Sequence, residues 1–199
     1  MSINLSKNQA INLSKSDGSA LTKVRMGLGW DVAKSGGLFG GLFGGGDSID
    51  LDASVIGFDA SGNTVDVVYF GNLSGFNGAV RHTGDNRTGD GDGDDESILV
   101  DLSRLPSQVH SLVFTVNSYT GQTFEKIANA TCRLVDQSSG RENEVAKVDL
   151  SQSGVHTGVA MAAIIRTNGG WSFKSVSEIC NGRTINDIER SLQSIVRAL

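Results

Sequence analysis

The sequence predicts an all-β protein: a two-sheet β-sandwich followed by one C-terminal amphipathic helix. Apolar and polar residues alternate in many short segments, glycine-containing turn signals separate these segments, and the apolar period becomes helical only near the C-terminus. The 199 residues have 38% apolar content, which is enough to bury a core. No linker divides them, so we expect a single domain over residues 1–199.

Strands are expected along most of the chain. Residues 24–30 and 49–55 each alternate apolar side chains with polar residues or glycine, which gives each segment one apolar face. The pattern continues, at a spacing typical of a sandwich, in residues 65–69, 98–102, 112–116, 131–135, 145–150, 158–165 and 171–176. Turn signals such as Ser61-Gly62-Asn63 and Ser139-Gly140 separate these segments.

The two ends of the chain carry different patterns. An octad occurs twice near the N-terminus, as INLSKNQA and INLSKSDG, and predicts two strands of one edge hairpin over residues 1–18. At the other end, Thr184 and Asp187 have the spacing of a capping box, and the apolar residues that follow share one helical face. We therefore expect a helix over residues 184–199 that packs on the sandwich. The sequence also permits a short helix near residues 122–129.

One short segment holds most of the excess negative charge. From Gly84 to Asp101 the sequence reads GDNRTGDGDGDDESILVD, and this segment has a net charge of -6 against -5 for the whole chain. Two carboxylates about 7 Å apart repel by roughly 2 kcal/mol at an effective dielectric of 20. We therefore expect the segment to order around a cation, with its glycines allowing the backbone to direct several oxygens to one point. The alternative is a solvated acidic loop.

The available ligand atoms favour Ca²⁺. Carboxylate and amide oxygens suit Ca²⁺ or Mg²⁺, and their large number suits the six to eight ligands of Ca²⁺. Zinc is disfavoured because no CxxC or HxxxH spacing exists; Cys132 and Cys180 are expected to be small buried apolar residues. An EF-hand fits only partway, because the segment has D-x-D-x-D spacing but Asp95 stands where that motif needs glycine.

A second unusual segment is SGGLFGGLFGGG, over residues 35–46. Its two Leu-Phe pairs, at residues 38–39 and 42–43, are bulky apolar groups in a backbone of glycine. We favour a long loop folded over the edge of the sandwich. The alternative is an exposed tip that makes a Ca²⁺-dependent contact with a membrane or a partner protein.

Other functional classes have little support. Paired carboxylates with His82 nearby would permit metal-dependent hydrolysis, but the sequence contains no GxSxG, HExxH or GxxxxGK motif. His82, His110 and His156 are expected to be surface or structural residues. No basic run indicates nucleic-acid binding, and no apolar stretch is long enough for a transmembrane segment. The N-terminus has no signal-peptide pattern, so secretion is not expected.

Several motifs carry a resemblance to a known family. GLGWD at 27–31, DLDAS at 50–54 and GDNRTGDGDGDDE at 84–96 resemble the TerD family of tellurite-resistance and stress-response proteins. The LFGGLFG insertion is most similar to the TerZ branch, and the similarity extends over residues 20–176. The resemblance implies a two-sheet sandwich, a cytoplasmic location, two neighbouring Ca²⁺ sites and no catalytic activity. It further implies action as an interaction module with other tellurite-resistance proteins, in complexes at the inner membrane surface.

The resemblance also implies a set of metal ligands. The residues that match the family motifs are Asp50, Asp52, Asp85, Asn86, Asp92, Asp94, Asp95 and Glu96. Asp31 and Asn72 are further candidates, although Gly71 replaces one of the paired asparagines that the family shows there. Asp90 replaces a glutamate, and its shorter side chain favours a supporting role. Asp50 and Asp52 leave their strand on the same side, so we expect them to meet the carboxylates of the acidic segment.

Overall fold

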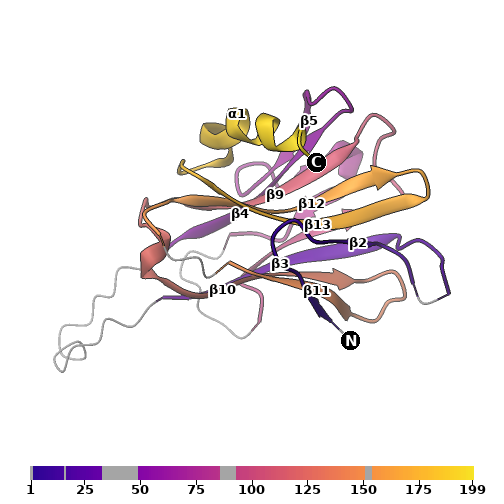
Figure 1. Ribbon diagram of the computed structural model, residues 1–199, viewed down its shortest axis with the longest axis horizontal. Coiled ribbons are helices and arrows are strands. Elements are labelled where there is room, and N and C mark those ends of the chain that lie inside the picture. Colours follow the sequence, from indigo (N-terminus) through magenta and orange to yellow (C-terminus); the bar gives the residue numbers. More distant parts are fainter. Residues whose placement is uncertain (1, 16, 33–48, 86–92, 151–153) are drawn as a thin grey trace.

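The computed structural model describes residues 2–15, 17–32, 49–85, 93–150 and 154–199, and it shows two β-sheets stacked face to face (Figure 1). The two-sheet sandwich expected from the sequence is thereby confirmed. The seven-stranded sheet has the order β1 (Ile3–Asn4), β11 (Asn143–Asp149), β10 (Ile127–Asp136), β3 (Lys23–Val32), β8 (Glu96–Asp101), β7 (Val80–His82) and β6 (Ser74–Gly75). The six-stranded sheet has the order β2 (Ala10–Asn12), β13 (Gly170–Cys180), β12 (Gly158–Thr167), β9 (Ser111–Ser118), β4 (Leu51–Phe58) and β5 (Thr64–Val68).

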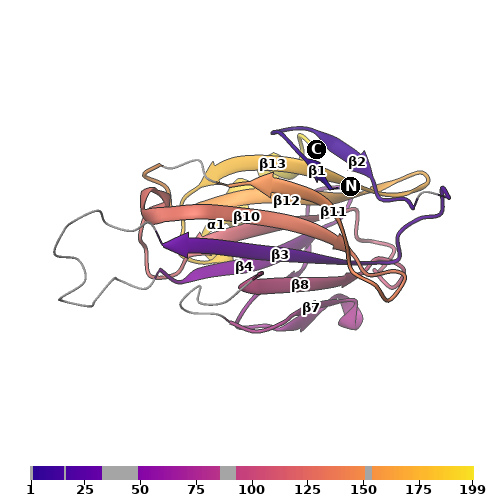
Figure 2. The same ribbon diagram turned by 90° about the horizontal axis from the view of Figure 1, so that it is seen from below.

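The main core lies between the two sheets. β3 runs beside β8 and β10 in the seven-stranded sheet (Figure 2). Its alternating apolar residues are buried in the core cluster. These residues are Val24, Met26, Leu28 and Trp30, and each is at most 3% exposed. Every second residue of β3 therefore packs against the six-stranded sheet, as the period of two in the sequence predicts.

The C-terminal helix covers the outer face of the six-stranded sheet. Helix α1 (Ile185–Val196) lies over β4 and β9 (Figure 1). Asp187 Oδ2 accepts hydrogen bonds of 2.9 Å from the backbone N–H groups of Arg183 and Thr184, which satisfies donors at the start of the helix. The apolar face of α1 forms a second core with the outer residues of β4, β9, β12 and β13. The predicted helix and its packing are confirmed.

The N-terminal hairpin prediction is wrong. Ile3 of β1, in the first copy, pairs in parallel with Ala146 of β11, whereas Ile11 of β2, in the second copy, pairs in antiparallel fashion with Phe173 of β13. The two copies of the octad therefore join different sheets. A repeated local pattern predicts that both copies are strands, but the pairing partner of each is chosen by contacts with strands far away in the sequence.

One further local prediction needs correction, and three short elements were not predicted. The expected helix near residues 122–129 is a single 3-10 turn, η2 (Phe124–Lys126), and strand β10 begins directly after it. A second 3-10 turn, η1 (Phe76–Gly78), and the short strands β6 and β7 had no clear sequence signal. Segments of two or three residues are too short to show a period; β7 is defined by its pairing with β8, and β6 by its pairing with β7.

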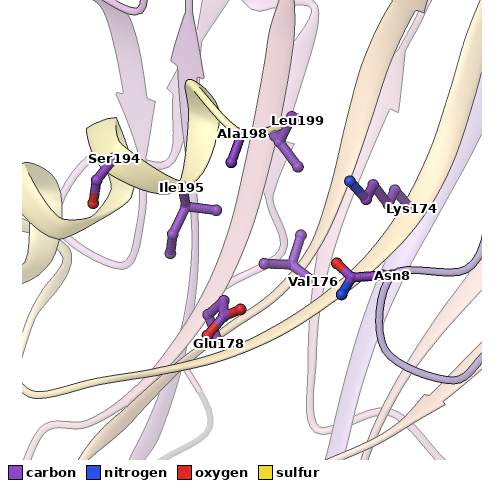
Figure 3. A pocket seen from close by; sticks show the side chains of 8 residues that line it. All are labelled: Asn8, Lys174, Val176, Glu178, Ser194, Ile195, Ala198 and Leu199. Carbon is purple, nitrogen blue, oxygen red and sulfur yellow. The ribbon is translucent and has the colours of Figure 1, made fainter.

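A hollow of about 240 Å³ lies beside the C-terminal end of α1 (Figure 3). Val176 and Ile195 face it from the sheet and the helix, with Lys174 and Glu178 at its polar side. Glu178 forms an ion pair of 2.9 Å with Lys7. Glu178 is the one acidic side chain among the residues that line this hollow, and it is already paired with Lys7. The hollow therefore lacks the group of carboxylates that a metal site needs.

Candidate metal centre

Three aspartates converge at one end of the sandwich. Asp50 lies just before β4, Asp52 lies within β4, and Asp85 follows β7. One carboxylate oxygen of each residue lies within 4.8 Å of those of the other two. Asp50 and Asp52 are two residues apart in extended chain, so their side chains share one face. They are 6% and 3% exposed, whereas Asp85 is exposed, so this group of three carboxylates opens to solvent on the Asp85 side.

Asp52 carries the strongest electrostatic signal of the group. Burial, as the largest cause, and the nearby negative charges of Glu96, Asp50 and Asp85 together raise the pKa of its carboxyl group from 3.8 to about 8. Its Oδ2 atom is buried and accepts no hydrogen bond from any described residue. A buried carboxylate oxygen without a donor is unfavourable unless a proton or a cation compensates it. The three carboxylates are hard oxygen ligands, and they fit Ca²⁺.

Strand β3 holds the end of the acidic segment. The N–H of Asp95 donates to the carbonyl of Leu28 at 2.8 Å, and the N–H of Trp30 donates to Asp95 Oδ2 at 3.0 Å. A Cβ on Gly29 would lie 2.9 Å from the carbonyl oxygen of Gly93, so the glycine permits this close approach. The GLGW motif and the end of the acidic run, 66 residues apart in sequence from Gly27 to Gly93, are therefore in direct contact.

Asp94 is held by arginines rather than grouped with the three aspartates. Its carboxylate forms ion pairs with Arg25 of β3 and Arg133 of β10. Arg25 also pairs with Glu142 at 2.8 Å, and Arg133 pairs with Glu144 at 3.4 Å. Asp94 thus belongs to an ion-pair network on the outer face of the seven-stranded sheet. Among the described carboxylates, the group within mutual reach of one cation is Asp50, Asp52 and Asp85.

Glu96 lies at the start of β8 and is 1% exposed. Its Oε2 accepts a hydrogen bond of 2.7 Å from the backbone N–H of Ala53, which belongs to the opposite sheet. The same oxygen lies 3.4 Å from Nε2 of His82. Glu96 therefore joins the two sheets directly behind the three aspartates, and its charge contributes to the raised pKa of Asp52.

Some expected ligands lie outside the described residues, and Asn72 binds a backbone carbonyl instead of joining the three aspartates. Asn86, Asp90 and Asp92 lie outside the described residues, as does the whole 35–46 segment. The backbone of Asp31 pairs with Ala128 in the β3–β10 ladder. Asn72 uses its side-chain amide to donate to the carbonyl of Val67 at 2.7 Å, in the turn after β5.

Sequence reasoning expected His82 to be a surface or structural residue, and it did not identify the contacts that His82, Arg25 and Arg133 make around the acidic residues. His82 is buried and contacts two backbone segments of the site, and Arg25 and Arg133 bind Asp94. The only local signal for His82 was its position three residues before Asp85. Nothing in the sequence marks Arg25 and Arg133, because their meeting depends on the register between β3 and β10.

Two further predictions concern the state of the cysteines and the presence of membrane-spanning helices. Cys132 and Cys180 are buried and unpaired, as expected, and burial raises the pKa of the Cys180 thiol to about 11. Neither thiol is therefore a reactive thiolate near neutral pH. In the described ranges, no helix has the length and apolar character needed to cross a membrane.

Comparison with known proteins agrees with this architecture and its motifs. Residues 1–190 match the TerD domain. The chain is 50% identical over 194 residues to tellurium resistance protein TerZ of Serratia marcescens, covering 98% of both chains. It is 43% identical over 198 residues to stress response protein SCP2 of Bacillus subtilis (strain 168), covering 94% of this chain and 98% of that protein.

A solved structure shares the fold at much lower identity. The crystal structure of a homologue of the telluride resistance protein TerD from Streptomyces coelicolor A3(2) matches with a TM-score of 0.70 and 19% identity, covering 87% of this chain and 98% of that one. This likeness concerns the fold alone. Together, the domain match over residues 1–190 and the 50% identity to a relative of equal extent show that the chain belongs to the TerD family of tellurium-resistance and stress-response proteins.

Proposed function

We propose that this member of the TerD family is a non-catalytic Ca²⁺-binding protein, and that Asp50, Asp52 and Asp85 hold one Ca²⁺. The observation that carries the proposal is the buried carboxylate of Asp52, whose pKa is raised to about 8 beside two further carboxylates. A divalent cation at this position would remove the repulsion among the three groups and supply the missing partner of Asp52 Oδ2. A second Ca²⁺ remains part of the proposal, with ligands from the acidic segment.

A hydrolytic role has less support from the same residues. The alternative needs His82 as a proton shuttle beside the metal. His82 is 5% exposed, and both of its ring nitrogens lie within hydrogen-bond distance of backbone groups, Nδ1 near the N–H of Gly84 and Nε2 near the carbonyl of Ala53. A ring whose nitrogens are both occupied is poorly placed to exchange protons with a substrate. The proposed role is therefore binding and interaction, with other tellurite-resistance proteins as partners at the inner membrane surface.

Calorimetric titration of the metal-free protein with Ca²⁺ and with Mg²⁺ tests the proposal directly. We expect binding of Ca²⁺ to be tighter than that of Mg²⁺, because the site offers many oxygens and one open side. Thermal unfolding in Ca²⁺ and in chelator gives a second measurement. Ca²⁺ at 100 times its Kd should add about 2.7 kcal/mol of stability. No binding heat together with equal unfolding midpoints would exclude a Ca²⁺ site in this protein.

A further inference from the structure

The ring of His82 connects the two backbone segments that carry the aspartates of the site. His82 is the last residue of β7, and its side chain is fully buried between the two sheets. Nδ1 lies 3.1 Å from the backbone nitrogen of Gly84, and Nε2 lies 3.1 Å from the carbonyl oxygen of Ala53. Gly84 directly precedes Asp85, and Ala53 directly follows Asp52. One imidazole therefore spans the gap between the Asp85 segment and the Asp52 segment.

The hydrogen bonds define the tautomer of the ring. The backbone N–H of Gly84 can only donate, so Nδ1 of His82 must accept and carries no hydrogen. The carbonyl of Ala53 can only accept, so Nε2 must donate and carries the hydrogen. The ring is thus a neutral imidazole with both nitrogens engaged. It has no lone pair left for a metal ion, and it adds no positive charge that would oppose a cation nearby.

Both backbone contacts lie where the sheets themselves provide no partner. Strand β5 pairs with β4 only from Val55 onward, so Ala53 lies beyond the paired stretch on that edge. The C=O of Ala53 is bound by His82, and its N–H is bound by Glu96. Both side chains come from the opposite sheet. At the other end of the ring, Gly84 has a φ of 121°, a conformation that turns the chain out of β7 toward Asp85.

We propose that His82 is the positioning residue of the metal site: it sets the distance between the Asp52 and Asp85 carboxylates without binding the ion. The inference rests on the proposed Ca²⁺ function and adds a residue outside the ligand set. When either contact of the ring is lost, the backbone beside one aspartate loses its restraint. The site must then order that segment when the ion binds, and the free energy required for ordering is subtracted from the affinity.

A purely structural role for His82 makes a different prediction. If the ring only filled space in the core, its replacement would lower the stability of the fold but leave the Ca²⁺ affinity of the folded protein unchanged. The discriminating quantity is therefore the Kd for Ca²⁺, measured on variants whose far-UV circular dichroism shows that they are folded.

Two amide substitutions separate the two contacts of the ring. In His82→Asn the side-chain amide reaches the position of Nδ1 and keeps the acceptor for Gly84, whereas in His82→Gln it reaches the position of Nε2 and keeps the donor for Ala53. Each variant breaks one side of the connection, so we expect each to weaken Ca²⁺ binding at least tenfold in calorimetric titration. The matched control is His156→Gln. His156 is also buried, at 4% exposure, but its ring contact is with Phe124.

The outcomes separate this inference from the proposed function. If the wild-type protein does not bind Ca²⁺, the proposed function fails. If the wild-type protein binds and both His82 variants bind with the same Kd, the positioning role is overturned while the Ca²⁺ function stands. If His156→Gln weakens binding as much as the His82 variants do, loss of affinity reflects general loosening of the core, which also overturns the positioning role.

A measurement on the unmutated protein covers the case in which both variants fail to fold. Long-range ¹⁵N–¹H correlation spectra of the histidine rings report which nitrogen carries the hydrogen. We expect His82 to show hydrogen on Nε2 and none on Nδ1, both in chelator and with Ca²⁺ alone added. Hydrogen on Nδ1 would be incompatible with the contact to the Gly84 amide and would overturn the inference.

Discussion

The carboxylate of Asp94 occupies the space above Gly27, where any other residue would place its side chain. A Cβ built on Gly27 would overlap both carboxylate oxygens of Asp94. The carboxylate is held in this position by Arg25 of β3 itself and by Arg133 of the neighbouring strand β10. Gly27, the first glycine of the GLGW motif, is required because the ion-paired carboxylate of Asp94 fills the space that a side chain would need. This relationship anchors that segment to β3.

Gly27→Ala should destabilise the protein by about 1 to 3 kcal/mol, because the new methyl group displaces the Asp94 carboxylate from its arginines. In an Asp94→Ala background the same substitution should cost less than about 0.5 kcal/mol, since the overlapping group is gone. Denaturant unfolding of the two single variants and the double variant measures this coupling. Gly169→Ala is the control, because a Cβ there meets nothing within 4 Å. Strictly additive costs in the double variant would contradict the relationship.

Asp94→Asn should lower stability to a similar extent with and without Ca²⁺. The side chains of Asp94 and Arg25 are only 6% and 12% exposed. Removing one partner of a buried pair costs about 3 kcal/mol, or roughly 6 to 12 °C in the unfolding midpoint of a chain this size. Glu142→Gln, in the same network but 57% exposed, should cost much less. A midpoint that falls in Ca²⁺ but not in chelator would instead identify Asp94 as a ligand.

Asp52→Asn should have opposite effects on stability and on binding. In the metal-free protein it removes a buried carboxyl group that must either hold a proton or carry a charge that three other carboxylates repel, so the unfolding midpoint in chelator near neutral pH should rise. Ca²⁺ affinity should fall at least tenfold, about 1.4 kcal/mol, because a charged ligand is lost. Thermal melts and calorimetric titration measure the two effects. Asp59→Asn, in an exposed turn, should leave affinity unchanged. An unchanged affinity in Asp52→Asn would remove this residue from the site.

The stabilisation by Ca²⁺ should depend on pH. The pKa of Asp52 is about 8 in the folded metal-free protein and about 3.9 in an unfolded chain. The folded state therefore holds a proton that the unfolded state has lost, and this contribution, fully present below about pH 4, is lost as the pH rises to about 8. Bound Ca²⁺ replaces that proton. The difference in unfolding midpoint between Ca²⁺ and chelator should therefore widen from pH 5 to pH 8. A constant difference would contradict this assignment.

Much of the fold could be predicted because side-chain alternation is a local property. The expected strand at 24–30 is β3, and that at 112–116 is β9, each extended by a few residues. The C-terminal helix could be predicted equally well, because its capping box and apolar face lie within 16 consecutive residues. The N-terminal hairpin could not be predicted correctly, because the same octad pairs with β11 in one copy and with β13 in the other.

The site was only partly predictable for a related reason. Asp50 and Asp52 share a strand face, so their convergence followed from local geometry, and the structure brings Asp85 to them. The acidic run itself could not show which carboxylates face arginines. Asp94 and Asp95 are adjacent in sequence, yet Asp94 binds Arg25 and Arg133 whereas Asp95 binds the backbone of β3. That division depends on which strands lie beside the segment.

The pairing of the first two strands has a consequence for the order of events during synthesis. β1 pairs with β11, and β2 pairs with β13, so each strand pairs with a segment that is synthesised roughly 140 to 160 residues later. A nascent chain leaving the ribosome cannot pair both of these strands until β13 has emerged. Completion of the sandwich at this edge therefore follows the synthesis of β13, and a chain that stops before β13 leaves β2 without its pairing partner.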